Sequence, residues 1–123
     1  MCGIDGIIFK KNNLDFEKIV QMNSMLEHRG PDSVGALSHK NILLGHTRLS
    51  ILDTSSKGTQ PMSNDGRYWI IYNGEIYNYL ELKEQLIEKN YKFYTNTDTE
   101  VALNAFKECG IKSFNLFNGY WVI

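Results

Sequence analysis

Apolar and polar positions along the chain form blocks with two different periods. Runs typical of strands cover residues 4–9, 34–38, 42–48, 68–72 and 91–94, and a last one begins at residue 120. Apolar residues at helical spacing cover 15–28, 78–90 and 97–110, and a short helix is expected over 111–116. This order of strands and helices predicts an α+β fold in which helices cover mainly antiparallel sheet.

Capping residues and turn signals mark the ends of these elements. Asp15 can cap the first helix, and Thr97 with Glu100 forms a capping box before the third. Gly30-Pro31 and Gly110 are typical stops for the helices that precede them. We also expect a polar turn over 10–13, an exposed loop over 53–64 and tight turns at 64–66 and 118–119.

Composition narrows the class of protein. A chain of 123 residues is long enough for one domain with a real core, and a net charge of −1 gives no reason to expect a nucleic-acid partner. The first residues show no charged region followed by an apolar one, so we expect no signal peptide, and no apolar run approaches the ~20 residues that span a bilayer. Two cysteines make no disulfide framework, which favours a reducing, cytoplasmic setting. Because the chain stops inside an apolar, strand-like run, we expect 1–123 to be an incomplete domain.

Cys2 is the first candidate for chemistry. If Met1 is removed, Cys2 carries a thiol and a free α-amino group, whose ordinary pKa values are about 8.5 and about 7.7–8.0. A nucleophile beside its own base near neutral pH suits covalent catalysis. The alternative is that Cys2 is an ordinary small residue that opens a strand.

A nucleophile needs an oxyanion hole and a substrate clamp, and the sequence offers candidates for both. Asn73-Gly74 follows an expected buried strand and could supply a side-chain amide and a backbone N–H, or could be a plain turn. Arg48 within an apolar run could hold a substrate carboxylate or form an internal salt bridge, for example to Asp53. Asp98 could receive a substrate ammonium or stabilise a helix N-terminus. Arg48 and Asp98 together would fit the two charges of an α-amino acid.

Other ionisable and aromatic residues are assigned structural roles. The turn at 28–32 holds one His and one Asp without further spaced ligands, so no metal site is expected, and Arg29 is expected to be an internal ion-pair partner. Cys109 is expected to be a buried thiol without a role. Tyr72, Tyr77 and Tyr79 are expected to pack in the core and at its rim.

Six motifs in order carry a resemblance to a known family. They are Cys2-Gly3-Ile4, His28-Arg29-Gly30-Pro31-Asp32, His46-Thr47-Arg48-Leu49-Ser50-Ile51, Gln60-Pro61-Met62, Asn73-Gly74-Glu75-Ile76-Tyr77-Asn78 and Thr97-Asp98-Thr99-Glu100. Over its whole length the chain closely resembles the glutaminase domain of glutamine-hydrolysing asparagine synthetases. These are class II glutamine amidotransferases of the N-terminal-nucleophile (Ntn) hydrolase type. The resemblance implies a four-layer αββα sandwich of largely antiparallel sheets, incomplete here at its C-terminus.

The resemblance also implies the catalytic roles. Cys2, freed of Met1, would attack the side-chain amide of glutamine and release ammonia, with its own α-amino group as the base. Asn73 and Gly74 would form the oxyanion hole, and the resulting γ-glutamyl thioester would be hydrolysed to glutamate. If Met1 stays, the α-nitrogen of Cys2 is an amide and that base is lost.

The substrate clamp and the partners follow from the same resemblance. Arg48 would hold the α-carboxylate of glutamine, Asp98 its α-ammonium, and Glu75 would also line the pocket. The glutaminase step would need no cofactor. ATP and magnesium are implied for a synthetase domain or subunit, absent from this chain, that would use the ammonia to amidate aspartate. Self-association as a homodimer stays open.

Three alternatives remain at this point. The chain could be the glutaminase module of a related amidotransferase in cell-surface sugar biosynthesis. It could be a non-catalytic module in which Arg48 and Asp98 bind an amino acid without turnover. It could also be another Ntn hydrolase, such as a peptidase or acylase, although paired charge grips suit a free amino acid better than a peptide.

Overall fold

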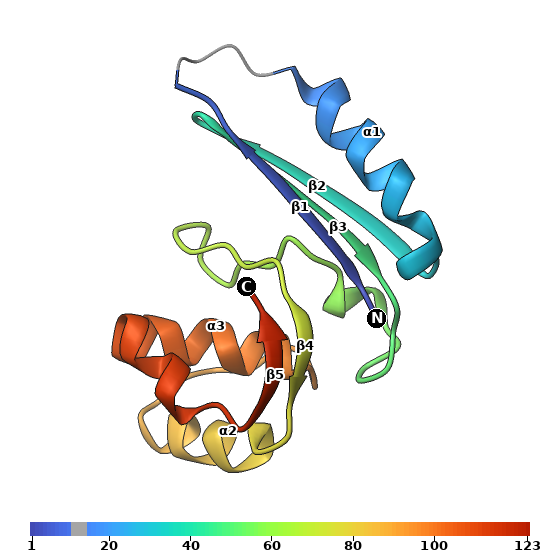
Figure 1. The fold of residues 1–123 in the computed structure, drawn as a ribbon. Coiled ribbons are helices and arrows are strands. Elements are labelled where there is room, and N and C mark those ends of the chain that lie inside the picture. Colours follow the sequence, from blue (N-terminus) through green and yellow to red (C-terminus); the bar gives the residue numbers. More distant parts are fainter. Residues whose placement is uncertain (11–14) are drawn as a thin grey trace.

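The computed structural model describes residues 1–10 and 15–123, so most of the turn expected over 10–13 lies outside the described residues. Helices and antiparallel strands follow one another as the α+β prediction requires (Figure 1). The strands are β1 (Gly3–Ile8), β2 (Ser33–His39), β3 (Ile42–Arg48), β4 (Asn73–Ile76) and β5 (Gly119–Val122). The α-helices are α1 (Phe16–Leu26), α2 (Tyr79–Glu88) and α3 (Asp98–Cys109), and short 3-10 turns cover Glu27–Arg29, Ser56–Gly58 and Gly110–Leu116.

The N-terminal half of the chain is an antiparallel sheet with the strand order β1-β3-β2 and with α1 on one face (Figure 1). Asp15 caps α1 as expected, because its carboxylate accepts a hydrogen bond of 3.2 Å from the backbone N–H of Glu17. In the register of the sheet, Gly3 lies opposite Thr47 and Ser33 lies opposite Arg48. The start of β1 therefore lies beside the end of β3.

The C-terminal half packs α2 and α3 against the β4-β5 ladder (Figure 1). In that ladder Asn73 lies opposite Val122 and Gly74 lies opposite Trp121. The buried core of this half consists of Met62, Ile70, Tyr72, Ile76, Leu82, Leu86, Val101, Ala102, Leu103 and Ala105. Burying these apolar side chains is the main stabilising term, at roughly 25 cal/mol for each Å² removed from water. None of the described helices is long and apolar enough to cross a membrane.

The expected buried strand over 68–72 is wrong. Within the described residues this stretch has an isolated bridge, in which Ile70 and Met62 exchange backbone hydrogen bonds of 2.9 Å. The strand begins instead at Asn73, where the sequence pattern predicted an end. The reason is the partner, since β5 supplies a hydrogen-bonding edge to residues 73–76 and not to the apolar run before them.

Three further expectations need correction. The short strand over 91–94 is not among the strands of the described residues, because the N–H of Tyr94 is taken by a side chain. The loop over 53–64 is not exposed throughout, since Gly58, Gln60 and Met62 in it are buried. Cys109 is exposed and not a buried thiol. Patterns of residue type do not show which loop folds back over a core.

The capping box before α3 is half formed. The hydroxyl of Thr97 accepts from the N–H of Glu100 at 3.2 Å, as the motif predicts. The carboxylate of Glu100 turns away and accepts from the N–H of Tyr94 at 3.0 Å, and from the N–H and the hydroxyl of Thr95 at 2.7 Å each. Glu100 is fully buried, so these donors supply the bonds that its charge needs. The loop before α3 is thereby fixed on the helix.

We expect Glu100→Ala to lower the free energy of unfolding by roughly 3 kcal/mol, because it leaves buried donors without their charged acceptor. Urea unfolding followed by circular dichroism measures the change. Glu108→Ala on the same helix is the matched control, because its carboxylate forms an exposed ion pair with Lys89 and should matter little. Equal losses in the two variants would contradict this account of Glu100.

Candidate active site

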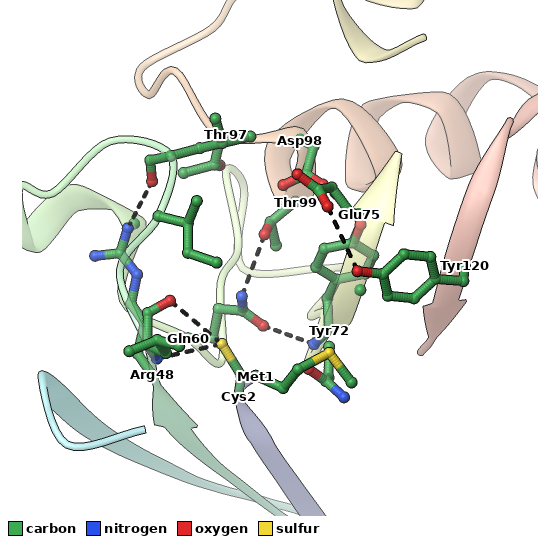
Figure 2. A pocket seen from close by; sticks show the side chains of 16 residues that line it. Met1, Cys2, Arg48, Gln60, Tyr72, Glu75, Thr97, Asp98, Thr99 and Tyr120 are labelled. Atoms are coloured by element: carbon green, nitrogen blue, oxygen red, sulfur yellow. Dashed lines mark hydrogen bonds between the residues drawn. The ribbon is translucent and has the colours of Figure 1, made fainter. Parts of the chain in front are cut away.

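A cavity of about 110 Å³ lies where the N-terminus, the end of β3, the start of β4 and the start of α3 meet (Figure 2). Drug-sized ligands occupy pockets of roughly 300–1,000 Å³, so this cavity suits a small metabolite. Every site residue predicted from the sequence lines it. These residues are Cys2, Arg48, Asn73, Gly74, Glu75 and Asp98.

Cys2 lies just before β1 and is held by contacts with the segment after β3. Its Sγ lies 3.3 Å from the backbone N–H of Leu49, which donates to it, and 3.6 Å from the carbonyl of Leu49 (Figure 2). The carbonyl of Cys2 accepts from Nε of Arg29 at 3.1 Å. Arg29 therefore holds the backbone of Cys2, and because no carboxylate pairs with it among the described residues, the expectation that it forms an ion pair is wrong. The thiol is half-buried and has an N–H donor that would stabilise a thiolate.

Arg48 is buried and is held by carbonyl groups of the loop that follows β3. Its Nη1 donates to the carbonyl of Ser55 at 2.7 Å, and its Nη2 donates to the carbonyls of Leu52, at 3.2 Å, and Asp53. Among the described residues no carboxylate pairs with Arg48, so the alternative of an internal salt bridge to Asp53 is wrong. A guanidinium has five N–H donors, and the carbonyls leave some of them for a ligand in the cavity.

Asp98 is buried at the start of α3, and one of its oxygens carries the contacts that hold it. Oδ2 accepts from the hydroxyl of Tyr72 at 2.7 Å and from the N–H of Ile76 at 3.1 Å. Burial, together with this bond to Asp98, raises the pKa of Tyr72 above its ordinary value, so the phenol stays protonated and donates. The carboxylate of Asp98 is thus held in one orientation, and both of these hydrogen bonds are to Oδ2.

Asn73 and Gly74 form the start of β4 and are not a plain turn. A Cβ at Gly74 would collide with the carbonyl of Tyr120 and with the backbone of Trp121, so the close approach of β5 requires glycine here. Glu75 follows them, and one of its oxygens accepts from the hydroxyl of Tyr120 at 3.5 Å (Figure 2). The pair that could form an oxyanion hole is therefore held by a strand ladder beside Cys2.

Sequence reasoning missed two of the residues that shape this cavity. Gln60 lines it from the loop expected to be exposed, and its side chain donates to the hydroxyl of Thr99 at 3.2 Å and accepts from the N–H of Tyr72 at 2.6 Å (Figure 2). Tyr72 packs in the core as expected, but the sequence did not predict that its hydroxyl also donates to Asp98. Gln60 does stand within one of the quoted motifs, but its pairing with residues far along the chain has no local signal.

His46 lies behind the cavity wall on β3 and is buried, with 1% of its surface exposed. Its Nε2 is 3.1 Å from the carbonyl of Tyr72. Burial lowers the pKa of His46 to about 4; the bond to Tyr72 opposes this shift and the charge of Arg48 adds to it. The imidazole is therefore neutral at neutral pH, and because a carbonyl only accepts, Nε2 carries the proton.

No group of three or more His, Cys, Asp or Glu side chains in residues 1–10 and 15–123 is placed to hold a metal ion. The cavity brings together a thiol that can act as a nucleophile, backbone and amide donors, the buried charges of Arg48 and Asp98, and the carboxylate of Glu75.

Comparison with known proteins identifies the family. A family model described as the glutamine amidotransferase domain matches residues 1–123. The chain is 49% identical over 113 residues to the glutamine-hydrolysing asparagine synthetase 1 of Bacillus subtilis, which covers 87% of this chain and 18% of that protein. It is 38% identical over 113 residues to asparagine synthetase 3 of the same organism, covering 88% and 18%, and 34% identical over 122 residues to asparagine synthetase 1 of Arabidopsis thaliana, covering 97% and 20%. The chain thus spans about a fifth of the length of these relatives.

The stability of the loop that holds Arg48 should fall at low pH, because the carboxylate of Asp53 forms hydrogen bonds within it. The carboxylate of Asp53 accepts from the hydroxyl and N–H of Ser55, at 2.6 and 3.1 Å, and from the N–H of Asn96 at 2.9 Å, and these bonds lower its pKa to about 2. A pKa below the unfolded value of about 3.9 means that this stabilisation is present above that pH and is lost as pH falls toward 2.

We therefore expect Asp53→Asn to lower the free energy of unfolding at pH 7, and the difference from wild type to shrink between pH 4 and pH 2. Urea unfolding at a series of pH values measures it. A difference that is as large at pH 2 as at pH 7 would contradict the assignment.

Proposed function

The chain belongs to the class II glutamine amidotransferase family, and from that membership we propose that it is the glutaminase part of an asparagine synthetase. In this role it hydrolyses glutamine to glutamate and ammonia. The observation that carries the proposal is the convergence of residues from four separate segments, at positions 2, 48, 73–75 and 98, on one small cavity.

The charges of the cavity support glutamine as the substrate. Arg48 and Asp98 are both buried and do not pair with each other in the part of the chain that the structure describes. A buried charge without a partner of opposite sign is costly, so each is suited to a charged ligand group. In our proposal the guanidinium binds the α-carboxylate of glutamine and the carboxylate binds its α-ammonium. Glu75 lines the same pocket, where the amino-acid end of glutamine would bind.

The side chain of glutamine then reaches Cys2. The thiolate attacks the amide carbon, the carbonyl π electrons move to oxygen, and the donors of Asn73 and Gly74 stabilise the resulting oxyanion. The α-amino group of Cys2, free once Met1 is removed, takes the thiol proton and passes it to the leaving nitrogen, so that the C–N bond breaks and ammonia leaves. Water adds to the γ-glutamyl thioester and the C–S bond breaks. Glutamate is released and the thiol of Cys2 is restored.

Three wider features belong to the proposal. The complete domain is an αββα Ntn-hydrolase sandwich, to which the layers α1, β1-β3-β2, β4-β5 and α2-α3 would contribute. The ammonia is used by a synthetase domain or subunit, with ATP and magnesium, to amidate aspartate. Relatives named as glutamine-hydrolysing asparagine synthetases support this acceptor. Free cysteines at positions 2 and 109, among the described residues, fit the reducing cytoplasm.

Cys2→Ala in the intact protein should abolish the release of glutamate from glutamine, because the step that forms the thioester has no nucleophile. Cys109→Ala is the matched control and should keep wild-type activity, since this thiol is exposed and far along α3 from the cavity. A coupled glutamate dehydrogenase assay measures both. An active Cys2→Ala variant would contradict the proposal. A wild-type protein that lacks Met1 and is inactive would also contradict it.

Arg48→Lys should raise KM for glutamine by at least about 10-fold, because an ammonium lacks the planar fork that binds a carboxylate while bonding loop carbonyls. Arg67→Lys is the control, since Arg67 is exposed and lies outside the cavity. Steady-state kinetics at varied glutamine concentration gives both values. An unchanged KM in Arg48→Lys would contradict the clamp.

A further inference from the structure

The backbone of Tyr72, immediately before the candidate oxyanion donors, is held by side chains. Its N–H donates to Oε1 of Gln60 at 2.6 Å, and its carbonyl accepts from Nε2 of His46 at 3.1 Å. Among the described residues Tyr72 belongs to no strand, so these side chains take the place of a ladder. The carbonyl of Tyr72 is part of the peptide that leads to Asn73, and rotation of that peptide would turn Asn73 away from Cys2.

We propose, resting on the glutaminase function above, that His46 is a positioning residue for the oxyanion hole. Its Nε2–H fixes the peptide between Tyr72 and Asn73, and through that peptide it fixes the donors of Asn73 and Gly74. His46 acts through the backbone and does not itself line the cavity.

Packing alone does not explain an imidazole at this position. Nδ1 of His46 is buried and has no hydrogen-bond partner in the part of the chain that the structure describes. An unpartnered buried polar atom destabilises the folded state, and an apolar side chain of similar size would avoid that penalty. What the imidazole adds is a donor that crosses from β3 to the segment before β4.

The placement of His46 on β3 means that one strand supports both substrate binding and the oxyanion hole. Alternate residues of a strand share a face, so His46 and Arg48 project from the same side of β3. β3 thus presents the substrate clamp directly and supports the oxyanion segment through Tyr72. The other end of Tyr72, its hydroxyl, holds Asp98. Loss of the His46 bond should therefore act on the chemical step, whereas loss of the Tyr72 hydroxyl should act on substrate binding.

The test compares variants in the intact protein that carries this chain, by steady-state glutaminase kinetics. His46→Leu should lower kcat by about 10–100-fold, approaching the loss of one oxyanion donor, and leave KM for glutamine within about 2-fold. His46→Gln should restore kcat to within about 3-fold of wild type, because its amide nitrogen stands as many bonds from Cα as Nε2 does. Tyr72→Phe, which removes the bond to Asp98, should raise KM with a smaller change in kcat.

His46→Asn completes the series, because its amide nitrogen is one bond too short to reach the carbonyl of Tyr72. The Gln and Asn variants both keep a buried amide and differ in reach, so they decide the question even if the Leu variant does not fold. A higher kcat in Gln than in Asn supports the proposal, and equal values overturn it. A wild-type kcat in His46→Leu, or a rise in KM alone, also overturns it. A wild type without glutaminase activity would instead count against the proposed function.

Discussion

The antiparallel pairing of β1 with β3 is the constraint on which the candidate site depends. It places Gly3 opposite Thr47, with the N–H of Gly3 donating to the Thr47 hydroxyl at 3.2 Å. A Cβ at Gly3 would lie 2.8 Å from that of Leu26, so glycine lets β1 run directly under α1. The residue before Gly3 is Cys2, and the residues after Thr47 are Arg48 and Leu49. Two backbones in register therefore bring the thiol of Cys2 close to Arg48 and to the N–H of Leu49.

Polar side chains supply the hydrogen-bond partners that the backbone around the cavity would otherwise obtain from a strand ladder. Backbone N–H and carbonyl groups removed from water need partners, and the segments around the site have few strands to supply them. Arg48 donates to carbonyls of the loop over 52–55, and Glu100 accepts from N–H groups of the loop over 94–95. Gln60 and His46 bond the N–H and the carbonyl of Tyr72. Each bond also fixes a segment in one orientation, which is the preorganisation that stabilisation of a developing charge requires.

The electrostatic character of the cavity follows from how its charges are held. Arg48 is surrounded by carbonyl dipoles and Asp98 by a hydroxyl and an N–H, so each is held by neutral groups that leave its charge in place. A carboxylate against Arg48, or a guanidinium against Asp98, would have cancelled that charge. The arrangement suits a zwitterionic ligand better than a peptide, whose main chain offers neither charge in its interior.

The sequence by itself determined the α+β class, the limits of α1, β2, β3 and α3 to within a few residues, and the identity of the candidate site residues at 2, 48, 73–75 and 98. These follow from periodicity, from caps such as Asp15 and Thr97, and from motifs whose residue types carry their chemistry. Only the tertiary structure decided that the apolar run over 68–72 is not a strand, that Gln60 is buried, and that Tyr72 joins His46 to Asp98. Those outcomes depend on which backbone edge or side chain arrives from elsewhere in the chain. Hydrogen bonds between residues 12, 26 or 39 positions apart leave no trace in a local pattern.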